Sequence, residues 1–302
     1  RRDRRAGRAE PQAMNIAARP VVAEAEPISQ GAIALIAAIV KQRTGQEITA
    51  NRTWRIETAL QPILRNHQCA SIDELAGRLS TTSDPAFADS VVEAILNYET
   101  SFFRDASVLD QVVDAALTLR AEAGNRRFRI WSAGCSTGQE PYSLAILLAE
   151  RLAADDPAFP EIIATDVSGH ALGRARSGRY TQFEIQRGMP IRRMMTWFDS
   201  DKDEWVARRD LVRRVQFRPL NLADDFQAPG KFDLILCRNV MLYFSAALRR
   251  QVFDRLAGSM TDTAMLVLGA GETVIGQTEA LAPCQRFRGF YRRAEMAKRR
   301  AD

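Results

Sequence analysis

The chain has 302 residues, of which 46% are hydrophobic and 26% charged, so it can bury at least one sizeable core. Its net charge of +5 comes from the ends: residues 1–10 carry five arginines against two acids, and residues 286–302 carry seven arginines or lysines against two. The part between them has no basic stripe with interleaved aromatics, which argues against a nucleic-acid partner.

Cysteine usage and hydropathy point to a cytoplasmic protein. The four cysteines are scattered and only two histidines accompany them, so we expect neither a metal site nor a disulfide framework. The apolar run at residues 32–40 is too short to cross a bilayer and is typical of a buried helix. We therefore expect no direct insertion into a membrane.

The two ends are expected to lie outside the fold. Residues 1–28 are charged at their start, poor in large apolar side chains and not headed by methionine, which indicates a flexible arm or a foreign leader, with Met14 as a natural start. Residues 297–302 form a short basic tail.

Residues 29–97 have helical periodicity throughout. Ile33, Ile36 and Val40 share one helix face, and the pattern Ser71-x-x-Glu74 is a capping box that opens a short helix. The pair at residues 84–85, Asp-Pro, is a typical helix start. The sequence predicts a small all-helical domain here.

From residue 128 onward, apolar strands alternate with helices. Alternation of this kind predicts a mostly parallel sheet covered on both faces, with ligands at the carboxyl ends of the strands. The expected strands are residues 128–133, 162–166, 215–220, 232–237 and 264–268. An insertion at residues 180–214 interrupts them, with a helix near 191–198 and a short strand near 205–208.

The first of these strands runs into a glycine-bearing turn and then an amphipathic helix. Gly134 and Gly138 let the backbone turn sharply and approach a ligand, but the G-x-x-x-G spacing is neither a P-loop nor a dinucleotide fingerprint. Glu140 either complements the helix dipole or receives a cationic ligand group. Because a carboxylate in this position would repel a phosphate, we do not expect the ligand to be held here by a phosphate group.

Three motifs together resemble the CheR family, the S-adenosylmethionine-dependent protein-glutamate O-methyltransferases of chemotaxis receptors. They are ETSFFRD at residues 99–105, GCSTGQEPYS at 134–143 and FDLILCRNVMLYF at 232–244. The resemblance covers residues 29–293. It implies a Rossmann-like class I methyltransferase domain at residues 98–296, with a small β-subdomain as the insertion and the helical domain, 29–97, facing the receptor.

The resemblance also implies a cofactor site for S-adenosylmethionine, with S-adenosylhomocysteine as the product. Glu140 would hold the ammonium of the methyl donor, and Asp166 would bind the ribose or, alternatively, cap the next helix. The other matching positions are Tyr98, Thr100, Arg104, Gly134, the pair Asn221 and Leu222, and the pair Asn239 and Val240.

One position departs from the family pattern N-x-T-x-F-F-R. Tyr98 stands where the pattern has asparagine, and Asn97 lies one residue earlier. Either the Tyr98 hydroxyl takes the place of the family asparagine, or a local shift lets Asn97 make the contact of that asparagine. We expect Arg104 and Tyr243 to border the line of methyl transfer, with Arg104 orienting the carboxylate of the acceptor or of the donor.

The resemblance thus implies an enzyme, expected to be monomeric, that methylates the cytoplasmic helical domain of chemotaxis receptors. A CheR-like module that binds the cofactor as a signal without catalysis is the main alternative, and a small-molecule methyltransferase is a third. The helical domain carries a local excess of positive charge, which is either an ordinary solvated face or, as the resemblance implies, a surface that meets acidic receptor helices: Lys41, Arg43, Arg52, Arg55 and Arg65.

Overall fold

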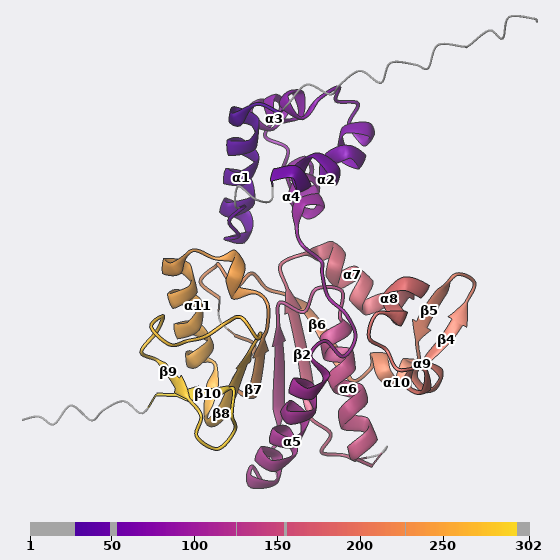
Figure 1. Ribbon diagram of the computed structural model, residues 1–302, viewed down its shortest axis with the longest axis vertical. Helices are drawn as coiled ribbons and strands as arrows, with labels where there is room; N and C mark the ends of the chain where they lie inside the picture. Colours follow the sequence, from indigo (N-terminus) through magenta and orange to yellow (C-terminus); the bar gives the residue numbers. More distant parts are fainter. Residues whose placement is uncertain (1–27, 49–52, 125, 154–155, 227, 295–302) are drawn as a thin grey trace, which may run out of the picture.

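The computed structural model of the chain describes residues 28–48, 53–124, 126–153, 156–226 and 228–294. Within these ranges a helical domain stands above an α/β domain (Figure 1). Apart from residue 28, the expected leader and the basic tail lie outside the described residues. None of the described helices is long and apolar enough to cross a membrane.

The N-terminal domain is helical, as predicted. Its apolar faces meet in one core in which Ile36, Leu60 and Leu75 are fully buried. The Ser71 hydroxyl caps its helix by accepting from the Glu74 amide, whereas the Glu74 carboxylate accepts from the Ala70 amide, one residue before the expected partner. The helices are α1 (Gln30–Thr44), α2 (Thr53–Asn66), α3 (Ile72–Thr81) and α4 (Pro85–Ile95).

The α/β domain is built on a seven-stranded sheet of order β6-β2-β1-β7-β8-β10-β9. Its five predicted strands pair in parallel: β1 (Arg129–Ala133), β2 (Glu161–Asp166), β6 (Val215–Pro219), β7 (Phe232–Cys237) and β8 (Met260–Leu268). Two short antiparallel strands that the sequence did not reveal complete the edge: β9 (Leu281–Pro283) and β10 (Phe290–Arg293). The predicted sheet is therefore confirmed.

Helices cover both faces of this sheet because alternate strand residues point to opposite sides. Ile130 and Leu234 belong to the core under α5 and α6, whereas Trp131 and Ile235 belong to the core under α11. The helices flanking the sheet are α5 (Ala106–Glu122), α6 (Gln139–Arg151), α7 (Gly169–Ser177) and α11 (Ala246–Gly258). The expected sheet with helices on both faces is therefore confirmed.

The predicted insertion forms a small subdomain beside the main sheet (Figure 1). Three antiparallel strands in the order β3-β5-β4 are accompanied by three short helices. Its elements are β3 (Arg179–Thr181), α8 (Gln182–Gln186), α9 (Ile191–Trp197), β4 (Phe198–Asp201), β5 (Glu204–Ala207) and α10 (Arg209–Val212).

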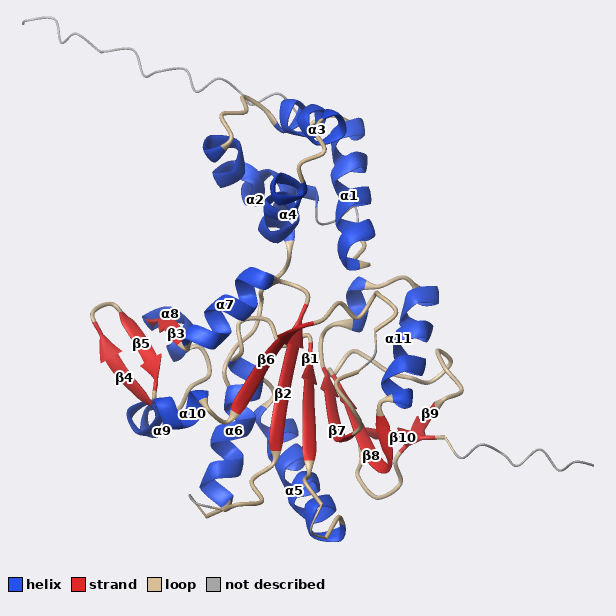
Figure 2. Ribbon diagram, turned by 180° about the vertical axis from the view of Figure 1, so that it is seen from behind, coloured by secondary structure: helices blue, strands red, loops and turns tan. Residues whose placement is uncertain are grey.

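The main sheet has its topological switch point between β1 and β7. The chain leaves β1 toward β2 and β6, and then returns to the other side of β1 to form β7. The carboxyl ends of these strands point toward the helical domain (Figure 2). Ligands of such sheets bind outside the carboxyl ends at the switch point, which locates the site to inspect.

Candidate active site

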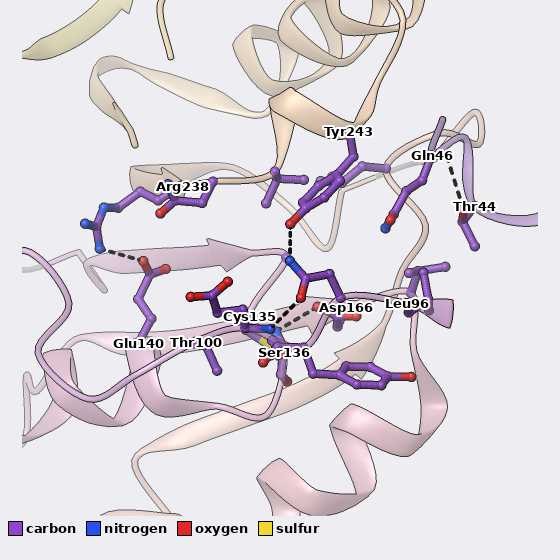
Figure 3. A pocket seen from close by; sticks show the side chains of 18 of the residues that line it. Thr44, Gln46, Leu96, Thr100, Cys135, Ser136, Glu140, Asp166, Arg238 and Tyr243 are labelled. Atoms are coloured by element: carbon purple, nitrogen blue, oxygen red, sulfur yellow. Dashed lines mark hydrogen bonds and ion pairs between the residues drawn. The ribbon is translucent and has the colours of Figure 1, made fainter. Parts of the chain in front are cut away.

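A cleft with about 950 Å³ of empty space, part of it open to solvent, lies at the carboxyl ends of β1, β2, β6 and β7 (Figure 3). Thr44 and Gln46, at the end of α1, line it from the helical domain, so both domains contribute to the wall. The structure brings every predicted site residue to this one cleft: Tyr98, Thr100, Arg104, Gly134, Glu140, Asp166, Asn221, Leu222, Asn239, Val240 and Tyr243.

The turn after β1 requires its two glycines. Gly134 has φ +76°, and a Cβ there would approach Val240 Cγ2 to 2.5 Å. Gly138 has φ +91°, and its Cβ would approach the Ala175 Cβ to 2.9 Å. Because a side chain at either position would collide with the opposite wall or with α7, only glycine lets β1 turn directly into α6.

Glu140, in the first turn of α6, is part of a buried ion-pair network (Figure 3). Its carboxylate accepts from the Ser132 hydroxyl at 2.8 Å and from the Arg238 guanidinium at 3.0 Å. The Arg238 side chain is only 2% exposed and also donates to the Asp105 carboxylate at 2.5 Å. Arg238 Nε has no hydrogen-bond partner among the described residues. The network therefore leaves the Glu140 carboxylate at the cleft wall, beside a buried arginine whose Nε–H is unpaired among the described residues.

Asp166 closes β2 and does not cap the next helix. Ser168 is the N-cap of α7, because its hydroxyl accepts from the Ala171 amide at 2.9 Å. The Asp166 carboxylate instead accepts from the Ser136 amide of the glycine turn at 2.7 Å and from the Ser168 amide at 2.9 Å. Of the two roles considered for Asp166, capping is thus filled by another residue.

Burial raises the pKa of the Asp166 carboxyl, and the hydrogen bonds from the two serine amides only partly oppose that rise. A carboxyl that holds its proton more tightly in the folded than in the unfolded chain makes folding less favourable as pH rises through its unfolded and folded pKa values. The ionised Asp166 therefore costs stability at a pH above both values, as is common for groups that serve binding.

Tyr98 and Asn97 take different directions from the same loop. The Tyr98 hydroxyl donates to Glu93 of α4 and accepts from Ser168 at 3.2 Å, and burial raises its pKa. The Asn97 amide nitrogen donates to the Tyr243 hydroxyl at 2.5 Å, and its oxygen accepts from Arg55 at 3.2 Å. Asn97 rather than the Tyr98 hydroxyl is therefore aimed at the cleft beside Tyr243.

The two asparagine pairs line the cleft by different means. The Asn221 side chain forms a turn with the Ala223 amide and donates to the Arg43 carbonyl at 3.0 Å, which ties β6 to the end of α1. Asn239 adopts φ +60°, and its amide donates to Glu272 at 2.8 Å. Leu222 is buried and Val240 half-buried, so together they supply an apolar wall.

Arg104 follows the paired phenylalanines and reaches the cleft from the segment before α5. Its guanidinium makes one long hydrogen bond within the described residues, 3.5 Å to the Glu99 carbonyl. Tyr243 comes from the short helix η2 (Met241–Tyr243) after β7, and its carbonyl accepts from the Glu47 amide at 2.8 Å. Cations and phenols in such positions can orient an anionic group.

Comparison with known proteins identifies the fold and its cofactor. The family model described as CheR methyltransferase, SAM binding domain, matches residues 98–289. The chain belongs to the CheR methyltransferase family. S-adenosylmethionine is the cofactor of this domain, as the sequence motifs predicted.

Relatives across several bacteria support this assignment. Chemotaxis protein methyltransferase 1 of Pseudomonas aeruginosa is 33% identical over 245 residues, which cover 80% of this chain and 89% of the relative. The chemotaxis protein methyltransferase of Vibrio parahaemolyticus is 32% identical over 80% of this chain and 88% of its own length. The protein of that name from Escherichia coli is 29% identical, with coverages of 78% and 82%.

The sequence had not singled out three charged residues that organise the CheR cleft. Arg238 joins Glu140 to Asp105, although it lies inside one of the recognised motifs. Glu272 accepts from the amides of Asn239 and Met241 at 2.8 Å each, which fixes the backbone after β7. Glu93 links α4 to Tyr98 and to the start of α7. Apart from the place of Arg238 in that motif, their signal in the sequence is a charge beside an apolar strand or helix.

Proposed function

We propose that this chain transfers methyl groups from S-adenosylmethionine to glutamate side chains of chemotaxis receptors, forming methyl esters. The observation that carries the proposal is the convergence of all the predicted cofactor and transfer residues on one cleft between the two domains. The proposal includes a monomeric protein acting in the cytoplasm on the helical receptor domain.

The chemistry of the cleft wall fits S-adenosylmethionine. Glu140 offers a carboxylate for the ammonium of the cofactor, and a carboxylate has enough lone pairs to accept a further donor beside Ser132 and Arg238. Asp166 offers its oxygens to the ribose hydroxyls. Leu96, Leu222 and Val240 offer an apolar surface for the adenine ring.

The reaction needs little acid–base assistance from the protein. When bound, S-adenosylmethionine supplies a sulfonium methyl group that a carboxylate oxygen can take directly. A glutamate with a pKa near ~4.3 is already ionised at neutral pH, so no general base is required. The protein must chiefly align the acceptor and remove water from it.

The two side chains proposed to border the transfer line are Arg104 and Tyr243. The Arg104 guanidinium is available to orient a carboxylate because its one hydrogen bond to the Glu99 carbonyl is long. The Tyr243 hydroxyl is held by the Asn97 amide at 2.5 Å. Asn97 lies one residue before the position at which the family pattern has asparagine, and it supports the proposed site by holding Tyr243.

Asp166→Ala is expected to weaken binding of S-adenosylmethionine by roughly ten- to a hundredfold, since a hydrogen bond to a charged group contributes about 1.5–3 kcal/mol. Calorimetric titration measures the affinity. Ser168→Ala is the control for a loosened start of α7, because Ser168 does not itself line the cleft, although its hydroxyl also donates to the cleft residue Tyr98. Equal affinities for Asp166→Ala and wild type in a folded protein would remove Asp166 from the ribose site.

The helical domain is the proposed receptor-facing surface, but its positive charges are less available than the sequence indicated. Lys41 pairs with Glu47, and Arg43 pairs with Asp89. Arg52 lies outside the described residues. Arg55 donates to Asn97 and Arg65 is exposed, so these two remain the candidates for steering an acidic receptor helix.

Arg55→Glu is expected to slow receptor methylation and to blunt its dependence on salt, because complementary charges speed encounter and are screened by ions. Initial rates across an ionic-strength series measure the effect. Arg65→Glu makes the same change of charge away from the cleft and separates steering from the Arg55–Asn97 contact. Curves that superimpose on wild type for both variants would mean that the helical domain does not steer the receptor.

Labelled S-adenosylmethionine and receptor-containing membranes provide the direct test. We expect protein-bound label that mild alkali releases as methanol, because methyl esters are base-labile. Cofactor binding without any transfer would instead identify a sensing module, and transfer only to small molecules would identify a different substrate class.

A further inference from the structure

The turn that carries Arg104 has a strained backbone. Phe103 and Asp105, on either side of Arg104, have φ values of +51° and +55°. A bulky non-glycine residue rarely adopts this left-handed conformation, and it persists only where the surroundings hold it. Strain at Phe103, followed by a second left-handed residue at Asp105, indicates that the direction of Arg104 depends on what holds the turn.

The α/β domain holds the turn from within. The Phe103 amide donates to the buried Ser143 hydroxyl of α6 at 2.9 Å, and that hydroxyl donates to the Gln139 carbonyl at 2.6 Å. Arg238 holds the other end of the turn by donating a hydrogen bond to the Asp105 carboxylate. These contacts fix the backbone on the side of the cleft.

The inserted subdomain holds the turn from the other side. The Arg193 guanidinium of α9 lies over the Phe103 ring, 4.6 Å from its centre. Arg193 is itself fixed by a two-pronged ion pair with Glu150 of α6, in which Nε lies 3.0 Å from Oε1 and Nη2 lies 2.8 Å from Oε2. The planar fork of arginine suits both contacts at once.

Two further contacts couple the insertion to the same turn. A Cβ on Gly188 would come within 2.1 Å of the Phe102 carbonyl, so the backbone of the insertion lies directly against the turn. The buried Phe102 ring packs edge-on against Tyr180 of β3 and Phe198 of β4. The insertion therefore contacts the two residues that precede Arg104.

We propose that Arg193, held by Glu150, is a positioning residue for methyl transfer. It covers the outer face of Phe103 and keeps the strained turn in the conformation that directs Arg104 into the cleft. The inserted subdomain then takes part in setting the transfer rate, in addition to any contact with a partner. The kinetic consequence rests on the proposed methyl transfer, whereas the structural consequence does not.

Arg193→Ala is the test, with Arg151→Ala as its matched control. Arg151 neighbours Glu150 on α6 and pairs with Asp114, so its removal also deletes an arginine ion pair but leaves the turn untouched. Hydrogen–deuterium exchange of a peptide covering residues 99–109, titration with S-adenosylmethionine and turnover on receptor membranes are measured for both variants.

For Arg193→Ala we expect faster exchange in this peptide, an unchanged cofactor affinity and a turnover number lowered by about tenfold, because small displacements of an aligned group cost up to ~100-fold in rate. Arg193→Lys keeps the charge but lacks the planar fork of arginine, so its exchange rate and turnover number should lie between those of wild type and Arg193→Ala. The control should match wild type in all three. Exchange and turnover in Arg193→Ala that equal those of Arg151→Ala would overturn the proposal.

The exchange measurement separates this proposal from the proposed function. The exchange measurement needs no receptor. A wild-type protein that fails to methylate receptors would contradict the proposed function, but the exchange data would still show whether Arg193 holds the turn. Should Arg193→Ala fail to fold, Glu150→Gln removes the charge that fixes Arg193 while keeping the arginine, and the same comparison decides.

Discussion

Arg104→Ala is expected to lower the turnover number on receptor membranes by roughly ten- to a hundredfold while leaving the affinity for S-adenosylmethionine nearly unchanged. The estimate takes about 1.5–3 kcal/mol for one lost hydrogen bond to a charged group. Arg104 lines the cleft and makes one long hydrogen bond within the described residues, so its guanidinium is available for the acceptor carboxylate. An interaction made only during transfer lowers turnover and its ratio to the Michaelis constant together.

Single-turnover kinetics and calorimetry on the same variant separate the two possible roles of Arg104. Arg104→Lys keeps the charge but not the planar fork, and it should recover part of the rate. If only the affinity for S-adenosylmethionine falls and bound cofactor reacts at the wild-type rate, Arg104 clamps the cofactor and its assignment to the transfer line is wrong.

Glu140→Ala is expected to weaken binding of S-adenosylmethionine by about ten- to a hundredfold, on the same estimate for a charged hydrogen bond. The loss has two physical sources. The cofactor ammonium loses its proposed acceptor, and Arg238, with its side chain 2% exposed, loses one of two carboxylate partners. A buried charge left with fewer partners adds to the cost.

Asp105→Ala distinguishes these sources, because Asp105 also pairs with Arg238 but does not line the cleft. We expect Glu140→Ala to reduce the affinity well beyond Asp105→Ala in calorimetric titrations. Equal losses in the two variants would mean that the effect passes through Arg238 and that Glu140 does not receive the ammonium.

The fold could be predicted from the sequence wherever periodicity was long enough. The strands β2 and β7 have apolar residues at their centres and are buried on both faces, and both were predicted to within a residue. The helix α5 was not predicted. Its N-cap residue Asp105 makes no side-chain capping hydrogen bond, so the usual local signal for a helix start does not operate there. The strands β9 and β10 have only three and four residues, too few for alternation to appear.

The candidate site was predictable only to the level of motifs. Matching positions converge on one cleft, but the motif could not reveal that Asn97 approaches Tyr243 while the Tyr98 hydroxyl bonds to Glu93. Asn97 follows α4 and Tyr243 follows β7, so their contact depends on the relative placement of two elements that are distant in the chain. The strain at Phe103 is likewise invisible in the sequence, since nothing in FFR indicates a left-handed backbone.

Mass spectrometry of receptor peptides after incubation with the protein and S-adenosylmethionine tests the proposed function most directly. The expected result is one added methyl group on individual glutamate side chains of the helical receptor domain, lost on mild alkali and reduced by roughly ten- to a hundredfold when Arg104→Ala replaces the wild type over the same short time. Receptor peptides that stay unmodified while the wild-type protein binds S-adenosylmethionine, or methyl groups found on residues other than glutamate, would contradict it.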